Sequence, residues 1–294
     1  MTLFGVPTQA LFGQLLIGLI NGAFYALLSL GLSVIFGLLN IINFAHGALY
    51  MMGAFVAYFC LQWVGLGYWW SLLIAPIVVG LVGILLERTM LKQLYHLDHL
   101  YGLLLTFGIA LVIEGLFRNE FGSSGLPYSI PDALRGSYNL GFMFLPTYRA
   151  WVVVFSLVVC LTTWYVIERT RLGAYLRAAT ENPTLVQAFG INVPRMITLT
   201  YGFGVGLAAL AGVLAAPIYQ VNPLMGANMI IVVFAVVVIG GMGSIMGSIV
   251  TGFGLGLIEG FTKVVYPPAS NTVIFVVMAL VLLIKPAGLF GQTK

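Results

Sequence analysis

The chain has 294 residues, of which 61% are hydrophobic and only 7% are charged, whereas a soluble domain carries about 25% charged residues. Its formal net charge is +4, but the basic residues are scattered singly and do not cluster with aromatic residues as they do in nucleic-acid-binding proteins. These properties exclude a soluble globular domain and a nucleic-acid partner, and they predict an integral membrane protein whose surface contacts lipid.

Apolar segments of membrane-spanning length recur along the whole chain. They lie at about 10–38, 42–60, 71–87, 102–118, 150–168, 196–216, 228–246, 249–266 and 272–284. Backbone groups in lipid must pair internally, which leaves helices or closed barrels, and barrels require segments of alternating polarity. Because these segments do not alternate, we predict an all-α polytopic transmembrane helical bundle with eight or nine spans, forming a single domain over 1–294.

The first two segments run together and carry polar residues at membrane depth. Six glycines from Gly18 to Gly53 predict broken or re-entrant helices in this region. Asn40, Asn43 and His46 follow one another at three-residue intervals, so on one helix they would form one polar surface, which Asn21 would join. Such side chains are costly in lipid unless paired, so two interpretations stand: they line a translocation pathway, or they form interhelical hydrogen bonds.

The loops between the segments predict the orientation. With nine spans and a cytoplasmic C-terminus, the basic residues divide eight to four between the inner and outer sides, as the preference of Lys and Arg for cytoplasmic loops requires. The longest extracytoplasmic loop, at 119–148, is rich in glycine and proline, which favour turns over regular structure. Such a loop is either a contact for an extracytoplasmic partner or a solvated connector.

The inner loop at 169–195 contains the signals of a short helix of about two turns. Asn182 is suited to cap this helix, Pro183 to occupy its first turn and Gly190 to end it in a left-handed conformation. Its apolar side chains are Leu185, Val186, Ala188 and Phe189. We predict that this helix either sits in a groove on another protein, or lies on its own protein or on lipid headgroups.

Two patterns in the later segments predict helix packing. Glycines recur at four-residue spacing near the C-terminus, at Gly252, Gly256 and Gly260, which allows a second backbone to approach closely. Glu259 precedes Lys263 by four residues and Glu114 precedes Arg118 by four, and both orders favour ion pairs on a helix. We predict that these pairs are structural and do not form a proton relay.

Several motifs resemble those of the permease subunits of branched-chain amino acid ABC importers. They are RAxxENP…GIN in the inner loop, the following GLAALAGVLAAP, INFAHG at 42–47, GGMGS at 240–244 and KPAGLFG at 285–291. Together they span nearly the whole chain in the family's order. The family pairs two unlike permeases, and INFAHG is more similar to the LivH-like member of that pair.

The resemblance implies roles for particular residues and a set of partners. In the family the short inner helix docks on an ATPase, which implies ATPase coupling by Glu181, Asn182, Pro183, Leu185, Phe189, Gly190 and Ile191. It also implies a second homologous permease subunit, two cytoplasmic ATPase subunits and an extracytoplasmic solute-binding protein. The implied location is the bacterial inner membrane, crossed several times.

The chain itself carries no nucleotide-binding motif. It lacks a GxxxxGK[ST] loop, so we expect no ATPase activity and no cofactor or metal in this chain. ATP and Mg would be bound by the partner ATPase subunits. The resemblance implies branched-chain amino acids or related small solutes as the transported solute, and the competing hypothesis is an ion-gradient-driven secondary transporter or channel that acts without ATPase partners.

Overall fold

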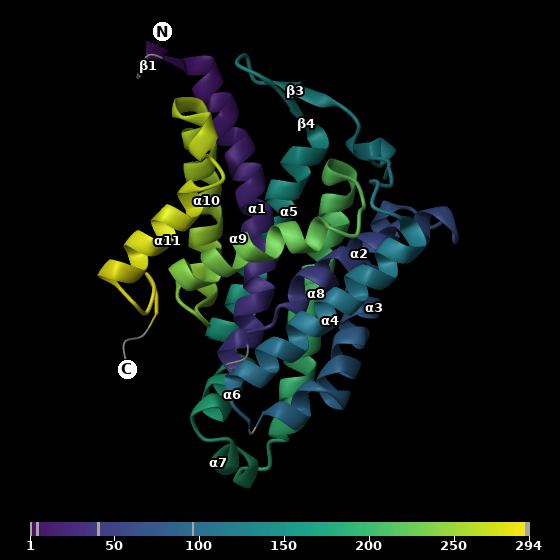
Figure 1. The fold of residues 1–294 in the computed structure, drawn as a ribbon, viewed down its shortest axis with the longest axis vertical. Helices are drawn as coiled ribbons and strands as arrows, with labels where there is room; N and C mark the ends of the chain where they lie inside the picture. The colour runs from purple at the N-terminus through teal and green to yellow at the C-terminus, as the bar shows by residue number, and fades with distance from the viewer. Residues whose placement is uncertain (1, 4–5, 40–41, 96, 292–294) are drawn as a thin grey trace. The chain divides into compact units, whose positions relative to one another are not determined.

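The computed structural model describes residues 2–3, 6–39, 42–95 and 97–291, and helices dominate it (Figure 1). Each predicted apolar segment forms an α-helix: α1 (Thr8–Leu39), α2 (Ala45–Gln62), α3 (Tyr68–Thr89), α4 (His99–Phe121), α5 (Thr147–Arg169), α8 (Val193–Tyr219), α9 (Met225–Gly240), α10 (Ile245–Val265) and α11 (Val273–Ile284). The prediction of an all-α polytopic bundle is therefore confirmed.

Smaller elements occupy the connections. Two further helices, α6 (Arg171–Glu181) and α7 (Pro183–Ala188), lie in the 169–195 loop. Three 3-10 helices are η1 (Leu91–Leu94), η2 (Asp132–Leu134) and η3 (Pro267–Ala269). Among the described residues, β1 (Thr2–Leu3) pairs antiparallel with β2 (Val6–Pro7), and β3 (Ser137–Asn139) pairs antiparallel with β4 (Phe144–Pro146). The 119–148 loop therefore contains regular structure, against the expectation of turns alone, because Gly136 and Gly141 lie outside the paired strands and Pro146 stands at the end of β4.

The helices differ in their capacity to cross a membrane. Six among the described residues are long and apolar enough by length and composition: α1, α3, α4, α5, α8 and α10. The apolar helices α9 and α11 have only 16 and 12 residues. At about 1.5 Å per residue they are shorter than a hydrocarbon core of about 30 Å. The prediction of eight or nine spans depends on these shorter helices and on α2, and it stays a prediction.

The chain divides into two compact units, each assembled from distant stretches of sequence. The first unit comprises Met1–Ser29, Ile130–Leu161 and Val232–Lys294, and the second comprises Leu30–Ser129 and Thr162–Ile231. Each unit is held together by the close packing of its own helices.

In the first unit, α10 packs against the first part of α1 with the two backbones in contact (Figure 1). The close approach is made where α10 carries the predicted glycines Gly252, Gly256 and Gly260. A Cβ on Gly256 would lie 2.5 Å from the Cα of Gly22 and closer still to the carbonyl oxygen of Gly18. The four-residue spacing therefore marks a face from which side chains are excluded, as in close-packed membrane helices.

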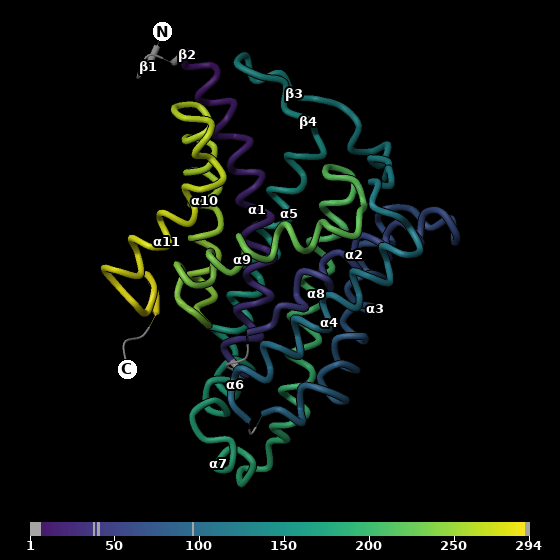
Figure 2. The backbone as a smooth tube through the Cα atoms, viewed as in Figure 1, coloured from purple at the N-terminus to yellow at the C-terminus, as the bar shows by residue number. Residues whose placement is uncertain are grey.

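In the second unit, α2 and α3 pack on α8, and the helices run side by side (Figure 2). Glycines again set the approach, because Gly53 of α2 meets the backbone of Ala209, and Gly80 of α3 lies where a Cβ would be 3.1 Å from the carbonyl oxygen of Gly202. The buried residues of this core are Ile35, Ala45, Leu49, Val79, Leu91, Tyr201, Val205 and Ala209. Close glycine contacts and apolar side chains thus fix α8 within its unit.

Candidate functional site

The 169–195 loop forms the short helix that its residues predict, α7. The side-chain oxygen of Asn182 accepts a hydrogen bond from the backbone N–H of Leu185 at 3.0 Å, which caps the first turn. Pro183 occupies the first turn, where its missing N–H costs nothing. Gly190 has φ +84°, the left-handed conformation that favours glycine at a helix end. Local sequence signals therefore define both ends of this helix.

One face of α7 is fixed and the other is open. Val186 is buried and packs with Ala179 of α6 and Val193 of α8. Leu185 of α7 and Phe189, the residue that directly follows the helix, are 55% and 77% exposed. A contiguous exposed patch of large apolar side chains is typical of a contact with another protein or with a membrane. The site can bind an apolar groove in another molecule.

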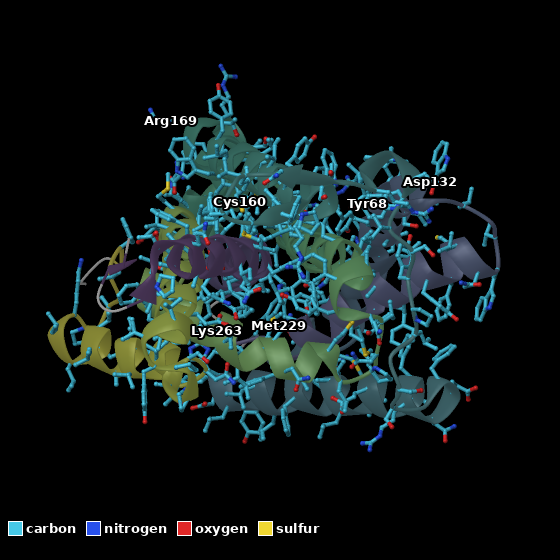
Figure 3. The ribbon with its side chains drawn as sticks, turned by 90° about the horizontal axis from the view of Figure 1, so that it is seen from above. Tyr68, Asp132, Cys160, Arg169, Met229 and Lys263 are labelled. Carbon is cyan, nitrogen blue, oxygen red and sulfur yellow. The ribbon has the colours of Figure 1, made fainter. Side chains whose placement is uncertain are left out.

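The loop begins with α6, a helix that the sequence analysis missed. Its buried residues are Gly173, Leu176 and Ala179, so a three-residue repeat of small or apolar residues was the available signal. The guanidinium of Arg177 donates to the carbonyl oxygen of Ile167 at 2.9 Å and lies 3.4 Å from the carboxylate of Glu168. These contacts tie α6 to the last turn of α5, and Arg169, labelled in Figure 3, ends that helix.

A second unpredicted feature lies at the start of α8, where α7 connects to it. The carboxylate of Glu87 is buried and accepts hydrogen bonds from the hydroxyls of Tyr95 at 2.6 Å and Thr198 at 2.7 Å. Burial, and then the hydrogen bond and the negative charge of Glu87, raise the pKa of Tyr95 above its ordinary range. Tyr95 is thus held as a neutral donor, and hydrogen bonds to Glu87 join the end of α3 to η1 and to the first turns of α8.

The polar residues near the end of α1 do not share one helix. Helix α1 ends at Leu39 and α2 begins at Ala45, so Asn43 lies in the break and His46 in the first turn of α2. Asn40 lies outside the described residues. The prediction that these residues form one polar surface on a single helix is therefore wrong, although the predicted break between the first two helices is confirmed.

Asn43 and His46 are both fully buried in this conformation. The amide nitrogen of Asn43 donates to the hydroxyl of Tyr201 on α8 at 3.0 Å, and its amide oxygen has no hydrogen-bond partner among the described residues. This hydrogen bond joins the break between α1 and α2 to α8, so it is a structural contact of the kind that the second interpretation describes, although only one of its partners lies on a helix. A role of Asn43 and His46 in a translocation pathway stays a prediction.

Asn21 belongs to a different set of contacts, in the first unit. Glu259 of α10 is buried and accepts hydrogen bonds from the Asn21 amide at 3.3 Å, the Tyr25 hydroxyl at 2.7 Å and the ammonium of Lys263 at 3.3 Å. Lys263 is labelled in Figure 3. The predicted ion pair is confirmed, and the additional donors satisfy the buried carboxylate as a structural network requires.

The other predicted ion pair is wrong. Among the described residues no ion pair joins Glu114 to Arg118, although their spacing on α4 is the same. Glu114 instead borders a cavity of about 240 Å³ whose walls include Phe107 and Ile230. Four-residue spacing permits a pair, but it contributes only about 0.2–0.5 kcal/mol, so the surroundings decide.

Comparisons with known proteins match the chain over almost its whole length. The model of a family described as branched-chain amino acid transport system / permease component matches residues 14–284. The high-affinity branched-chain amino acid transport system permease proteins LivH of Escherichia coli (strain K12) and BraD of Pseudomonas aeruginosa are each 30% identical, with 96% of both chains covered. LivM of Escherichia coli is 27% identical over 92% of this chain and 68% of its own length.

Proposed function

The chain belongs to the family of permease components of branched-chain amino acid transport systems, and from this premise we propose that separate ATPase subunits drive it through the 169–195 loop. It is a permease subunit of an ABC importer in the bacterial inner membrane. The transported solutes that the relatives suggest are branched-chain amino acids, and the chain would form half of the translocation pathway.

The exposed apolar face of α7 is the observation that carries this proposal. Leu185 and Phe189 are exposed, whereas Val186 packs against the rest of the chain. An ATPase subunit could therefore bind these two side chains without unfolding the loop. Anchors of this kind, buried in a groove of the partner, supply most of the binding energy of a helix-in-groove contact. Glu181 and Ile191, at the two ends of the same segment, complete the proposed contact.

The contacts around α7 provide a route for movement into the membrane helices. Val186 joins α7 to the beginning of α8, and Arg177 joins α6 to the end of α5. When two ATPase subunits close on ATP, a pull on α7 would therefore reach α5 and α8 as connected helices. Rigid elements that move together in this way are the usual means of converting one open state of a transporter into another.

The proposal includes the other partners and the orientation. A second, homologous permease subunit would complete the pathway, a solute-binding protein would deliver solute at the outer face, and the C-terminus would lie in the cytoplasm with the 169–195 loop. ATP and Mg would be bound by the ATPase subunits. An ion-gradient mechanism is not favoured, since the buried carboxylates of Glu87 and Glu259 are engaged in hydrogen bonds that a proton carrier would have to break.

A photo-crosslinker in place of Phe189 tests the docking directly. In intact membranes we expect a covalent adduct between the chain and an ATPase subunit, because this side chain projects from α7. The control places the same crosslinker at Leu283, a strongly exposed apolar residue on α11, where adducts with lipid or the second permease are expected. Adducts of position 189 with lipid alone, or with the extracytoplasmic binding protein, would refute the proposal.

A further inference from the structure

A basic pocket lies at one end of the second unit, beside the Glu87 contacts. It is a cavity of about 550 Å³ where the end of α3 and the 3-10 helix η1 meet the first turns of α8. Its lining residues are Arg88, Lys92, Asn192, Pro194, Arg195 and Thr198. Three cationic side chains from three separate elements therefore converge on one concave surface.

The cationic side chains of this pocket lack ion-pair partners in the part of the chain that the structure describes. None of Arg88, Lys92 and Arg195 forms an ion pair there. Glu87 borders the pocket through Thr198, but its carboxylate is buried and already accepts two hydrogen bonds. Three cations against this one carboxylate leave two positive charges, which favours an anionic ligand.

Apolar surface continues from the pocket along both helices. On α3, Leu81 and Leu85 precede Arg88 by seven and three residues and so lie on its side of the helix. On α8, Leu199 follows Arg195 by four residues and takes the same side. All three leucines are more than half exposed. A polar, cationic end thus adjoins an apolar strip that leads into the membrane-spanning part of each helix.

We propose that this pocket binds the phosphate of an anionic phospholipid, with the acyl chains lying along the exposed leucines of α3 and α8. Arginine matches the geometry of phosphate oxygens with two parallel N–H donors, and lysine adds a point charge. Basic pockets between membrane helices on the cytoplasmic side are suited to lipid headgroups. A soluble anion would leave the apolar strip without a ligand, whereas a phospholipid occupies both parts.

The test is a titration of the purified full-length chain in detergent with fluorescent phosphatidylglycerol. Each Lys or Arg near an anionic lipid surface contributes about a fivefold gain in binding. The R88Q/K92Q/R195Q variant is therefore expected to bind roughly a hundredfold more weakly than the wild type. Each single variant is expected to bind phosphatidylglycerol about fivefold more weakly than the wild type. The elution volume of each variant in size-exclusion chromatography checks that it is folded.

Controls separate the lipid from other anions and from charge in general. The R118Q/R149Q/K285Q variant removes three basic residues outside the pocket and is expected to bind phosphatidylglycerol as tightly as the wild type does. Phosphatidylcholine, which has no net charge, is expected to bind poorly to both proteins. Equal weakening in this control, or full displacement of the lipid by millimolar inorganic phosphate, would overturn the proposal. The proposal would also be overturned if the R88Q/K92Q/R195Q variant bound the lipid normally but no longer co-purified with the ATPase subunits from membranes, because the pocket would then be an ATPase contact. No ATPase or uptake is needed for the titration, so its failure leaves the proposed function intact.

Discussion

Replacing both Leu185 and Phe189 with aspartate is expected to abolish association with the ATPase subunits and to lower ATP-driven uptake at least about a hundredfold. These two side chains are the exposed apolar anchors of α7, and the substitution would place two carboxylates in an apolar groove. Because neither side chain is buried within the chain, the amount of folded protein in the membrane should not change. Co-purification of the ATPase and uptake of labelled solute measure the two effects.

The matched control is Leu97→Asp. Leu97 is about as exposed as Leu185 and lies in the loop between α3 and α4, so this variant places one aspartate at an exposed apolar position outside α7. We expect this variant to retain its ATPase and its uptake. Normal uptake by the double aspartate variant, or an equal loss in the control, would show that α7 is not the contact through which the ATPase acts.

Gly256→Leu is expected to prevent accumulation of the folded chain. A Cβ at this position would collide with the backbone of α1 at Gly18 and Gly22, and backbone atoms cannot rotate away as a side chain can. Overpacking of this kind costs about 1–3 kcal/mol or more, and the upper end is expected here because two helices must separate. Separation would also break the hydrogen bonds from Asn21 and Tyr25 to Glu259. Size-exclusion chromatography of the extracted protein measures the folded fraction.

The control for this prediction lies two residues away on the same helix. Gly254 has open space where its Cβ would be, so Gly254→Leu introduces the same side chain without a collision. This variant should accumulate and elute like the wild type. If both variants accumulate equally, the contact between α1 and α10 is not as close as the structure has it.

Much of the helical architecture is predictable because a bilayer imposes simple requirements. A chain that must pair its backbone internally and face lipid over about 20 residues shows long apolar runs, and each of these runs forms a helix in the structure. Their capacity to span is less predictable. Helix α11 ends after 12 residues although the apolar segment alone suggested a further span. Length of an apolar run does not reveal whether a helix crosses, tilts or stops partway.

The 169–195 loop illustrates which parts of a functional site can be predicted from the sequence. The cap, first turn and left-handed end of α7 are local features, so Asn182, Pro183 and Gly190 could be identified from neighbouring residues alone. The bond between Glu87 and Thr198 could not, because the two residues are more than a hundred positions apart. For the same reason Asn21 was grouped with Asn43, although its amide bonds to Glu259 near the other end of the chain.

Uptake into proteoliposomes tests the central claim, that this permease is powered by separate ATPase subunits, most directly. Vesicles containing the chain, its partner permease and the ATPase subunits, with ATP trapped inside and the binding protein outside, are expected to accumulate labelled leucine, isoleucine or valine. Vesicles that lack the ATPase subunits should accumulate none. Accumulation by the chain alone under an ion gradient, unaffected by ATP, would contradict the account.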